Sequence, residues 1–157
     1  PEGPPHRGEP AQKVDVPRRI GRTKGGLNSK LHAVCDDKGR PLVLLLSEGQ
    51  MSDHKGARLM LGALPPASSL IADKGYDSNW FRQALIERAI EPCIPSNRTR
   101  KQPLPYDKAL YRQRHRIENM FGRIKDWRRI ATRYDRCAHT FFSAICIAAS
   151  VVFYLNQ

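Results

Sequence analysis

The feature that most constrains the fold is the segment 106–130, where apolar side chains recur with the period of an α-helix. Successive helical residues rotate by about 100°. An arc about 100° wide therefore collects Leu110, Ile117, Met120, Phe121 and Ile124. Such an arc is typical of a helix that packs on a core. We expect one long helix over about 106–130, with this face buried.

A second stripe, roughly 60° wide, lies beside the apolar arc on the same helix. It contains Tyr111, Arg114, Glu118 and Lys125. Glu118 is then a lone carboxylate among cations, at the border between core and solvent. Two interpretations remain open for it. The carboxylate suits a divalent metal held against a phosphate, and it suits an ordinary ion pair equally well.

The charge of the chain is concentrated around this helix. The 157 residues, enough for one ordinary domain, carry a net charge of +12 and a pI near 10.0. Residues 98–136 hold thirteen Lys or Arg against four acidic residues, whereas residues 31–97 hold seven against eight. A solvated charged face is the plain explanation. The concentration of positive charge around this helix favours a nucleic acid partner.

The rest of the chain divides into a Pro-rich, basic and flexible segment, 1–20, and a folded part, 21–157. Alternating apolar residues predict a β-hairpin over 29–36 and 42–47. Cap residues predict helices after Ser52 and after Asp77 or Ser78. The expected helices are 53–63, 79–90 and 138–155, and the expected short strands are 69–72 and 92–95. This order indicates an α/β fold.

The cysteines and the apolar carboxyl-terminal run indicate in which cellular compartment the protein is found. The four cysteines include no CxxC pair, which indicates a reduced, cytoplasmic protein without disulfides or structural zinc. The apolar run 141–155 is shorter than the roughly 20 residues that a membrane span needs. We expect a core helix and no membrane partner.

Asp73 is the second candidate site residue, because it follows the predicted buried strand 69–72. Polar groups at the carboxyl ends of such strands form the sites of α/β sheets. Phosphodiester chemistry is assisted by two divalent ions, which prefer carboxylate oxygens. The other explanation is an aspartate that caps a turn.

Further residues of the helix could contact DNA. Arg114 and Lys125 would neutralise phosphate charge, and Tyr111 could stack on a base or donate to a phosphate. Arg128 and Arg129 could grip a strand by charge, with Trp127 either stacking beside them or lying in the core.

The stripe matches the signature Y-x2-R-x3-E-x6-K, and the chain resembles the DDE transposases of bacterial insertion sequences, in the group of the families numbered four and five. The resemblance extends over residues 20–157. It includes the motifs GRTKGG at 21–26, GQMSDH at 49–54, ADKGYD at 72–77 and RIATRYD at 129–135.

The resemblance implies a ribonuclease H-like mixed sheet flanked by helices, and DNA transposition by cleavage and strand transfer. It also implies two Mg²⁺ ions, which Mn²⁺ can replace. Asp73 resembles the second member of the Asp, Asp, Glu triad and Glu118 the third, while Tyr111, Arg114 and Lys125 would order DNA. The implied partners are double-stranded insertion-sequence ends, target DNA and further copies of the chain.

One part of the family pattern is missing. The first triad Asp belongs on a strand upstream of the hairpin, at the centre of the sheet, and no such strand is predicted here. Asp15 is a poor replacement, because Gln12, Lys13 and Pro17 leave too short a segment around it. We therefore expect the carboxy-terminal part of the catalytic domain, lacking the first strand. The alternatives are a catalytically inactive DNA-binding remnant and a ribonuclease H-like nuclease, which needs only the carboxylates.

Overall fold

The computed structural model describes residues 18–155, so Asp15 and most of the segment predicted to be flexible lie outside the described residues. The described chain begins with the predicted hairpin. Strands β2 (Gly26–Cys35) and β3 (Pro41–Glu48) pair antiparallel, with Ala33 opposite Leu44, and the short β1 (Gly21–Thr23) pairs with the start of β2. The hairpin prediction is confirmed.

A second sheet follows, with α-helices before and between its strands. Strands β4 (Ser69–Ile71) and β5 (Glu91–Cys93) are parallel, and Ile71 lies opposite Cys93. Helix α1 (Asp53–Met60), extended by a 3-10 turn (Leu61–Ala63), precedes β4, and α2 (Asn79–Ile86) connects β4 to β5. Within residues 18–155 no strand joins the two sheets into one. The fold is mixed α/β, as expected.

The helix starts were predicted correctly because their caps are local. The Ser52 and Ser78 side chains accept hydrogen bonds from the backbone amides of Lys55 and Phe81. Helix α2 ends earlier than the predicted residue 90. Ala89 adopts φ +58° and the amide of Ile90 donates to Leu85 O, a termination that usually employs glycine.

The single helix expected over 106–130 is wrong in detail. The segment forms α3 (Lys108–Tyr111), a 3-10 turn (Arg112–Arg114), α4 (His115–Lys125) and α5 (Arg128–Ala131). The chain leaves the helical conformation at Trp127, which is 39% exposed. The break has a packing reason. A continuous helix would rotate Ile130 about 240° from Ile124, away from the core, whereas both are buried here in one cluster.

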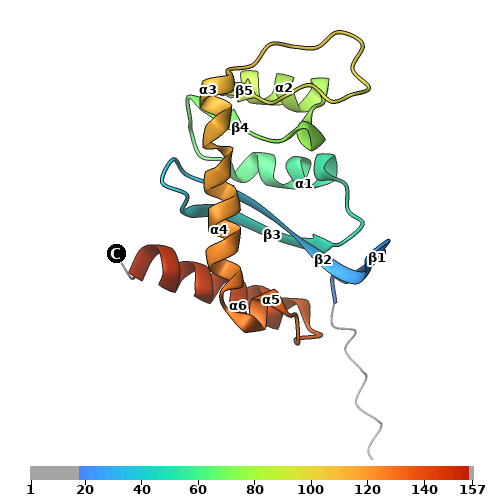
Figure 1. Ribbon diagram of the computed structural model, residues 1–157, viewed down its shortest axis with the longest axis vertical. Coiled ribbons are helices and arrows are strands. Elements are labelled where there is room, and N and C mark those ends of the chain that lie inside the picture. Colours follow the sequence, from blue (N-terminus) through green and yellow to red (C-terminus); the bar gives the residue numbers. More distant parts are fainter. Residues whose placement is uncertain (1–17, 156–157) are drawn as a thin grey trace, which may run out of the picture.

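Two apolar clusters organise these elements. One lies between the hairpin, α4 and the last helix, α6 (Ala138–Ser150), and contains Met120, Ile124, Phe141 and Ile145. The other is a cluster of buried apolar residues among α1, α2, β4 and β5, and it includes Leu85. Figure 1 shows α4 running past the hairpin, from α3 at the upper end of the molecule to α5 and α6 at the lower end. The helical run that carries Glu118 therefore joins both parts.

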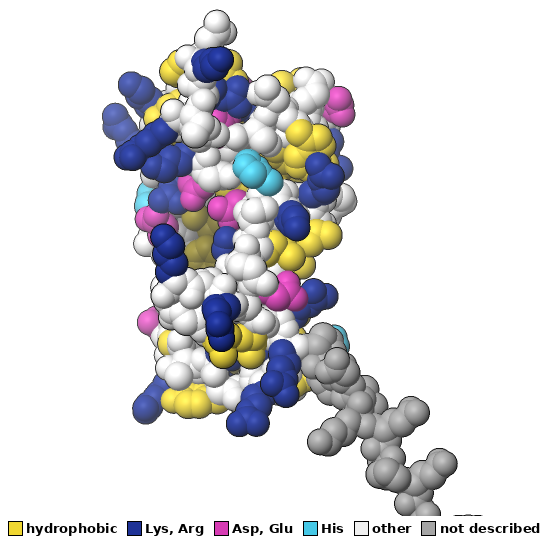
Figure 2. Space-filling view, turned by 90° about the vertical axis from the view of Figure 1, so that its right-hand side faces the viewer, with side chains coloured by type: hydrophobic (Ala, Val, Ile, Leu, Met, Phe, Trp, Pro, Cys, Tyr) yellow, Lys and Arg dark blue, Asp and Glu magenta, His cyan; other side chains and the backbone are white. Residues whose placement is uncertain are grey.

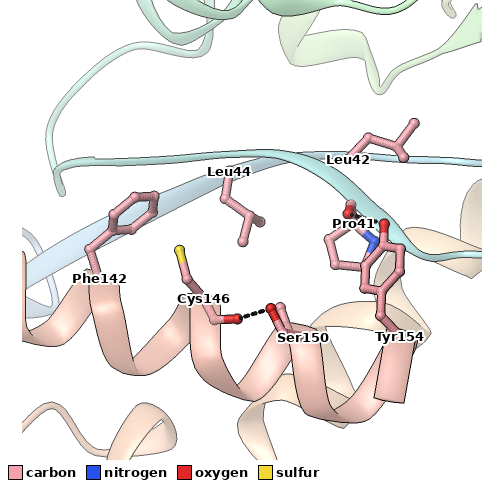
Figure 3. A pocket seen from close by; sticks show the side chains of 8 residues that line it. Pro41, Leu42, Leu44, Phe142, Cys146, Ser150 and Tyr154 are labelled. Carbon is pink, nitrogen blue, oxygen red and sulfur yellow. Dashed lines mark hydrogen bonds between the residues drawn. The ribbon is translucent and has the colours of Figure 1, made fainter. Parts of the chain in front are cut away.

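Helix α6 continues into a π-helical turn (Val151–Leu155). The combined helix Ala138–Leu155 is long and apolar enough to cross a membrane by length and composition, a test that core helices also pass. Its inward face supplies Phe141, Ile145 and Phe153 to the core, as predicted for a core helix. Toward β3 a shallow groove is lined by Leu44, Phe142 and neighbours (Figure 3), and it contains none of the predicted site residues.

Candidate active site

Asp73 lies just beyond β4, at the carboxyl end of the two parallel strands. Its Oδ1 accepts a hydrogen bond of 2.7 Å from the amide of Gly75 and so begins the 3-10 turn Lys74–Tyr76. Asp73 therefore caps a turn, which was the other explanation of this residue. Its Oδ2 has no hydrogen-bond partner within residues 18–155, which leaves an oxygen free for another ligand.

Asp53 lies close to Asp73, beside Gly75. A Cβ atom built on Gly75 would lie 2.8 Å from Asp53 Oδ2 and 2.9 Å from Asp73 Oδ1, so both carboxylates lie next to the same point. The other oxygen of Asp53 accepts from Lys30 Nζ at 3.1 Å. Sequence reasoning missed Asp53, because an acidic residue in the first turn of a helix is ordinary and carries no distinct signal.

A network of buried polar side chains lies near the turn that Asp73 caps. His32 on β2 is 2% exposed, and its ring nitrogens lie 3.0 Å from Ser47 Oγ and 3.5 Å from the Tyr76 hydroxyl. Burial and then Lys30 lower the pKa of His32, which keeps the ring neutral. Burial raises the pKa of Tyr76 well above its usual value, and the charges of Asp53 and Asp73 add to this. The network ties the turn that carries Asp73 to the hairpin.

Tyr111 is the last residue of α3 (Lys108–Tyr111). Burial raises the pKa of its hydroxyl, the charge of Arg114 opposes this, and the negative charge of Asp73 raises it further. The Tyr111 ring packs edge-on against Tyr106, with the ring centroids 5.4 Å apart. Helix α3 begins at Asp107, whose side chain accepts from two backbone amides. Cys93 Sγ lies 3.3 Å from Asp107 O, so the start of the helical run lies beside the carboxyl end of β5, the strand paired with β4.

Glu118 is exposed on α4, and its Oε1 accepts a hydrogen bond from Arg114 Nη2, one turn earlier. The ion pair that was one of the two interpretations of Glu118 is present. Lys125 and Arg128 are exposed and form no ion pair within residues 18–155, whereas Arg129 pairs with Asp135 at 2.8 Å. The structure thus brings Glu118 together with Arg114 and Asp73 together with Asp53, but within residues 18–155 no hydrogen bond or ion pair joins Asp73 to Tyr111 or to Glu118.

The donor chemistry for a metal is present, but the donor set is incomplete. Carboxylates are the ligands that Mg²⁺ prefers. Within residues 18–155, however, no three His, Cys, Asp or Glu side chains gather closely enough to hold an ion. The described residues therefore do not form a complete metal site, and a site that includes Asp73 needs a further ligand.

The surface of the molecule is basic, as its net charge of +12 requires. Figure 2 shows one face of the molecule, on which Lys and Arg side chains outnumber acidic ones and gather at the upper end and along one edge. A recess with hydrophobic side chains at its floor opens near the middle of this face, beside acidic side chains. A surface of this kind suits a polyanionic partner.

Comparison with known proteins identifies relatives over most of the chain. Residues 6–153 match the family described as Transposase DDE domain. The chain is 32% identical over 127 residues to a Brucella ovis protein described as a transposase for insertion sequence element IS6501, covering 80% of this chain and 98% of that protein. A Burkholderia cepacia transposase for IS402 is 32% identical over 140 residues, covering 77% of this chain and 64% of that protein. No solved structure gives a significant match.

A third relative, the transposase for IS1106 of Neisseria meningitidis serogroup B, is 30% identical over 128 residues. That alignment covers 78% of this chain and 42% of the relative. The chain thus spans nearly all of the Brucella protein and about two thirds or less of the other two.

Proposed function

This chain belongs to the Transposase DDE domain family, whose members act in DNA transposition, and we propose that it forms the carboxy-terminal part of a catalytic domain that cuts and joins DNA at insertion-sequence ends. Double-stranded ends and target DNA are the proposed partners, with several copies of the chain assembled on the DNA. The net charge of +12 supports a DNA partner.

One observation carries the proposal of a catalytic site. Asp73 stands at the carboxyl end of β4 with one free carboxylate oxygen, and Asp53 lies close to it. The helical run that carries Glu118 begins after Asp107, whose carbonyl oxygen lies 3.3 Å from Cys93 Sγ on the strand paired with β4. We propose that Asp73 and Glu118 are two carboxylates of a divalent-metal site for Mg²⁺ or Mn²⁺. A residue outside the described part of the chain would complete it.

The proposed DNA-binding residues differ in whether their side chains already hold an acidic partner. Lys125 and Arg128 are exposed without an ion-pair partner among the described residues, so both are free to bind phosphates. Arg114 and Arg129 already hold Glu118 and Asp135. In the proposed complex, Arg114 exchanges Glu118 for a phosphate, because a bidentate guanidinium suits either anion.

The test is strand cleavage and joining with Mg²⁺, measured for the chain and for the chain extended upstream through its next hydrophobic strand. We expect the extended chain to cleave, and Asp73→Asn and Glu118→Gln to abolish cleavage. Glu87→Gln is the matched control, because Glu87 is an exposed acid at the end of α2. Equal rates in the parent and both site variants would remove Asp73 and Glu118 from the mechanism.

A DNA-binding remnant without catalysis is the second candidate, because the described residues do not gather three metal-ligating side chains. It predicts DNA binding whose affinity falls steeply as salt rises, and no cleavage by the extended chain. Binding that ignored salt would count against it. Because the relatives are transposases of insertion sequences, nothing favours an independent nuclease.

A further inference from the structure

The loop of residues 94–107, which we call the basic arm, connects β5 to α3 without regular secondary structure. A loop of this length in a compact domain usually has a function. The arm carries Arg98, Arg100 and Lys101, and its first acidic residue is Asp107 at the very end. In Figure 1 the arm forms the upper end of the molecule, and Figure 2 shows Lys and Arg side chains at that end.

One buried carboxylate holds the arm in place. The Asp77 side chain is completely buried and accepts hydrogen bonds from Arg100 Nε and Nη2, both at 2.9 Å, and from the amide of Asn97 at 2.8 Å. Arg82 Nε donates to the same carboxylate at 2.8 Å. Arg100 also donates to Asn79 Oδ1 at 2.7 Å. The arm is thus fixed to the start of α2.

The cations of the arm divide into two kinds. Arg100 is used internally, since its guanidinium is occupied by Asp77 and Asn79. Arg98 and Lys101 are exposed, and neither forms an ion pair with any residue in the range 18–155. A buried anchor beneath two free cations is a favourable arrangement for binding a polyanion, because little ordering entropy remains to be lost on binding.

Both ends of the arm lie at the carboxyl end of the paired strands β4 and β5, the end at which Asp73 follows β4. The arm begins after Cys93, which pairs with Ile71, and Ala72 donates its amide to Cys93 O at 3.3 Å. It ends at Asp107, whose carbonyl oxygen lies 3.3 Å from Cys93 Sγ. A DNA strand bound along the arm would therefore pass the carboxyl end of β4.

We infer that the basic arm is a clamp for the DNA backbone, in which Arg98 and Lys101 bind phosphates and the Asp77–Arg100 fork fixes their position. This inference rests on the proposed function, since it assumes a DNA partner. It assigns that partner to a surface separate from the stripe on α4.

The experiment measures binding of the chain to a duplex oligonucleotide across a salt series. Arg98→Gln/Lys101→Gln should lower the slope of log affinity against log salt by about 2 and weaken binding about tenfold or more near 0.1 M salt. The control is Lys24→Gln/Lys38→Gln, which removes the same charge from two exposed turn positions. It should lose clearly less affinity.

A third variant separates position from charge. Arg100→Lys keeps the net charge but loses the planar fork that grips both oxygens of Asp77. We expect it to weaken DNA binding several-fold and to speed amide hydrogen exchange within the arm while α6 keeps its protection. Unchanged affinity together with faster exchange would show that Arg100 orders the arm but that DNA binding does not depend on this order, which would overturn the positioning role of the Asp77–Arg100 fork in the clamp.

The outcomes separate the two proposals. A parent chain that binds DNA while the arm and control doubles lose equal affinity overturns the clamp but leaves the proposed function intact. A parent chain that does not bind duplex DNA overturns both. Protection of Lys101, but not Lys24, from acetylation by bound DNA would support the clamp independently of affinity.

Discussion

The two ends of the Lys74–Tyr76 turn hold aspartates in opposite circumstances. Asp77 is buried, and two guanidinium groups and a backbone amide occupy its oxygens. Asp73 is partly exposed, keeps one oxygen free and lies near the like charge of Asp53 beside Gly75. The difference indicates which carboxylate serves the fold. A carboxylate whose partners all come from the protein stabilises it, and one with a free oxygen beside another carboxylate is available for a ligand.

The strongest test of this comparison is Asp77→Asn. Removing one partner of a buried ion-pair network leaves the guanidinium groups of Arg82 and Arg100 uncompensated, and we expect a loss of about 3–5 kcal/mol in the free energy of unfolding. Urea unfolding followed by circular dichroism measures it. Asp126→Asn is the control, because Asp126 is exposed and its side chain forms no ion pair within residues 18–155. Equal stabilities of the two variants would contradict the role given to Asp77.

Lowering the pH should weaken the same network around Asp77. Burial alone would raise the pKa of Asp77, but the bonds from Arg100, Asn97 and Arg82 outweigh burial and hold it far below its usual value. Its unfolded pKa is about 3.9. The contribution of Asp77 is therefore complete above about pH 4 and is lost as the pH falls from there towards the folded-state pKa. Below about pH 4, urea midpoints should fall more steeply with decreasing pH for the parent than for Asp77→Asn, whereas between pH 4 and 6 the two should run in parallel. Parallel curves below about pH 4 as well would refute this.

Sequence reasoning reached the parts of this region that depend on neighbouring residues. The caps at Ser52 and Ser78 and the hairpin alternation are local, and all of them were predicted. The Asp77–Arg100 fork joins residues 23 positions apart, and Asp53 meets Asp73 only through the packing of α1 on the turn. No periodicity marks such contacts. The break at Trp127 was missed for the same reason, since it serves the burial of Ile130.

Gly75→Ala tests the other end of the turn. The added methyl group would lie within 3 Å of both carboxylates, so the side chains of Asp53 and Asp73 must shift. Both are flexible side-chain ends, and we expect a stability cost of only about 1 kcal/mol. Cleavage by the upstream-extended chain should fall about 100-fold, because small displacements at a catalytic centre cost that much. Gly62→Ala, where a Cβ meets no atom within 4 Å, is the control. Unchanged cleavage would show that the spacing of the carboxylates does not matter.

Glu118→Gln should have the smallest effect on stability, in contrast to the large loss expected for Asp77→Asn. The Glu118 side chain is 57% exposed, and its partner Arg114 lies one helical turn away on the same face. Exposed pairs of this kind contribute about 0.3–0.5 kcal/mol. We expect the urea midpoint to stay within error of the parent, and to respond to salt no more than the parent does. If Glu118→Gln lost as much stability as Asp77→Asn, Glu118 would be a structural residue. The exposed pair on α4 would then no longer support its assignment to a metal site.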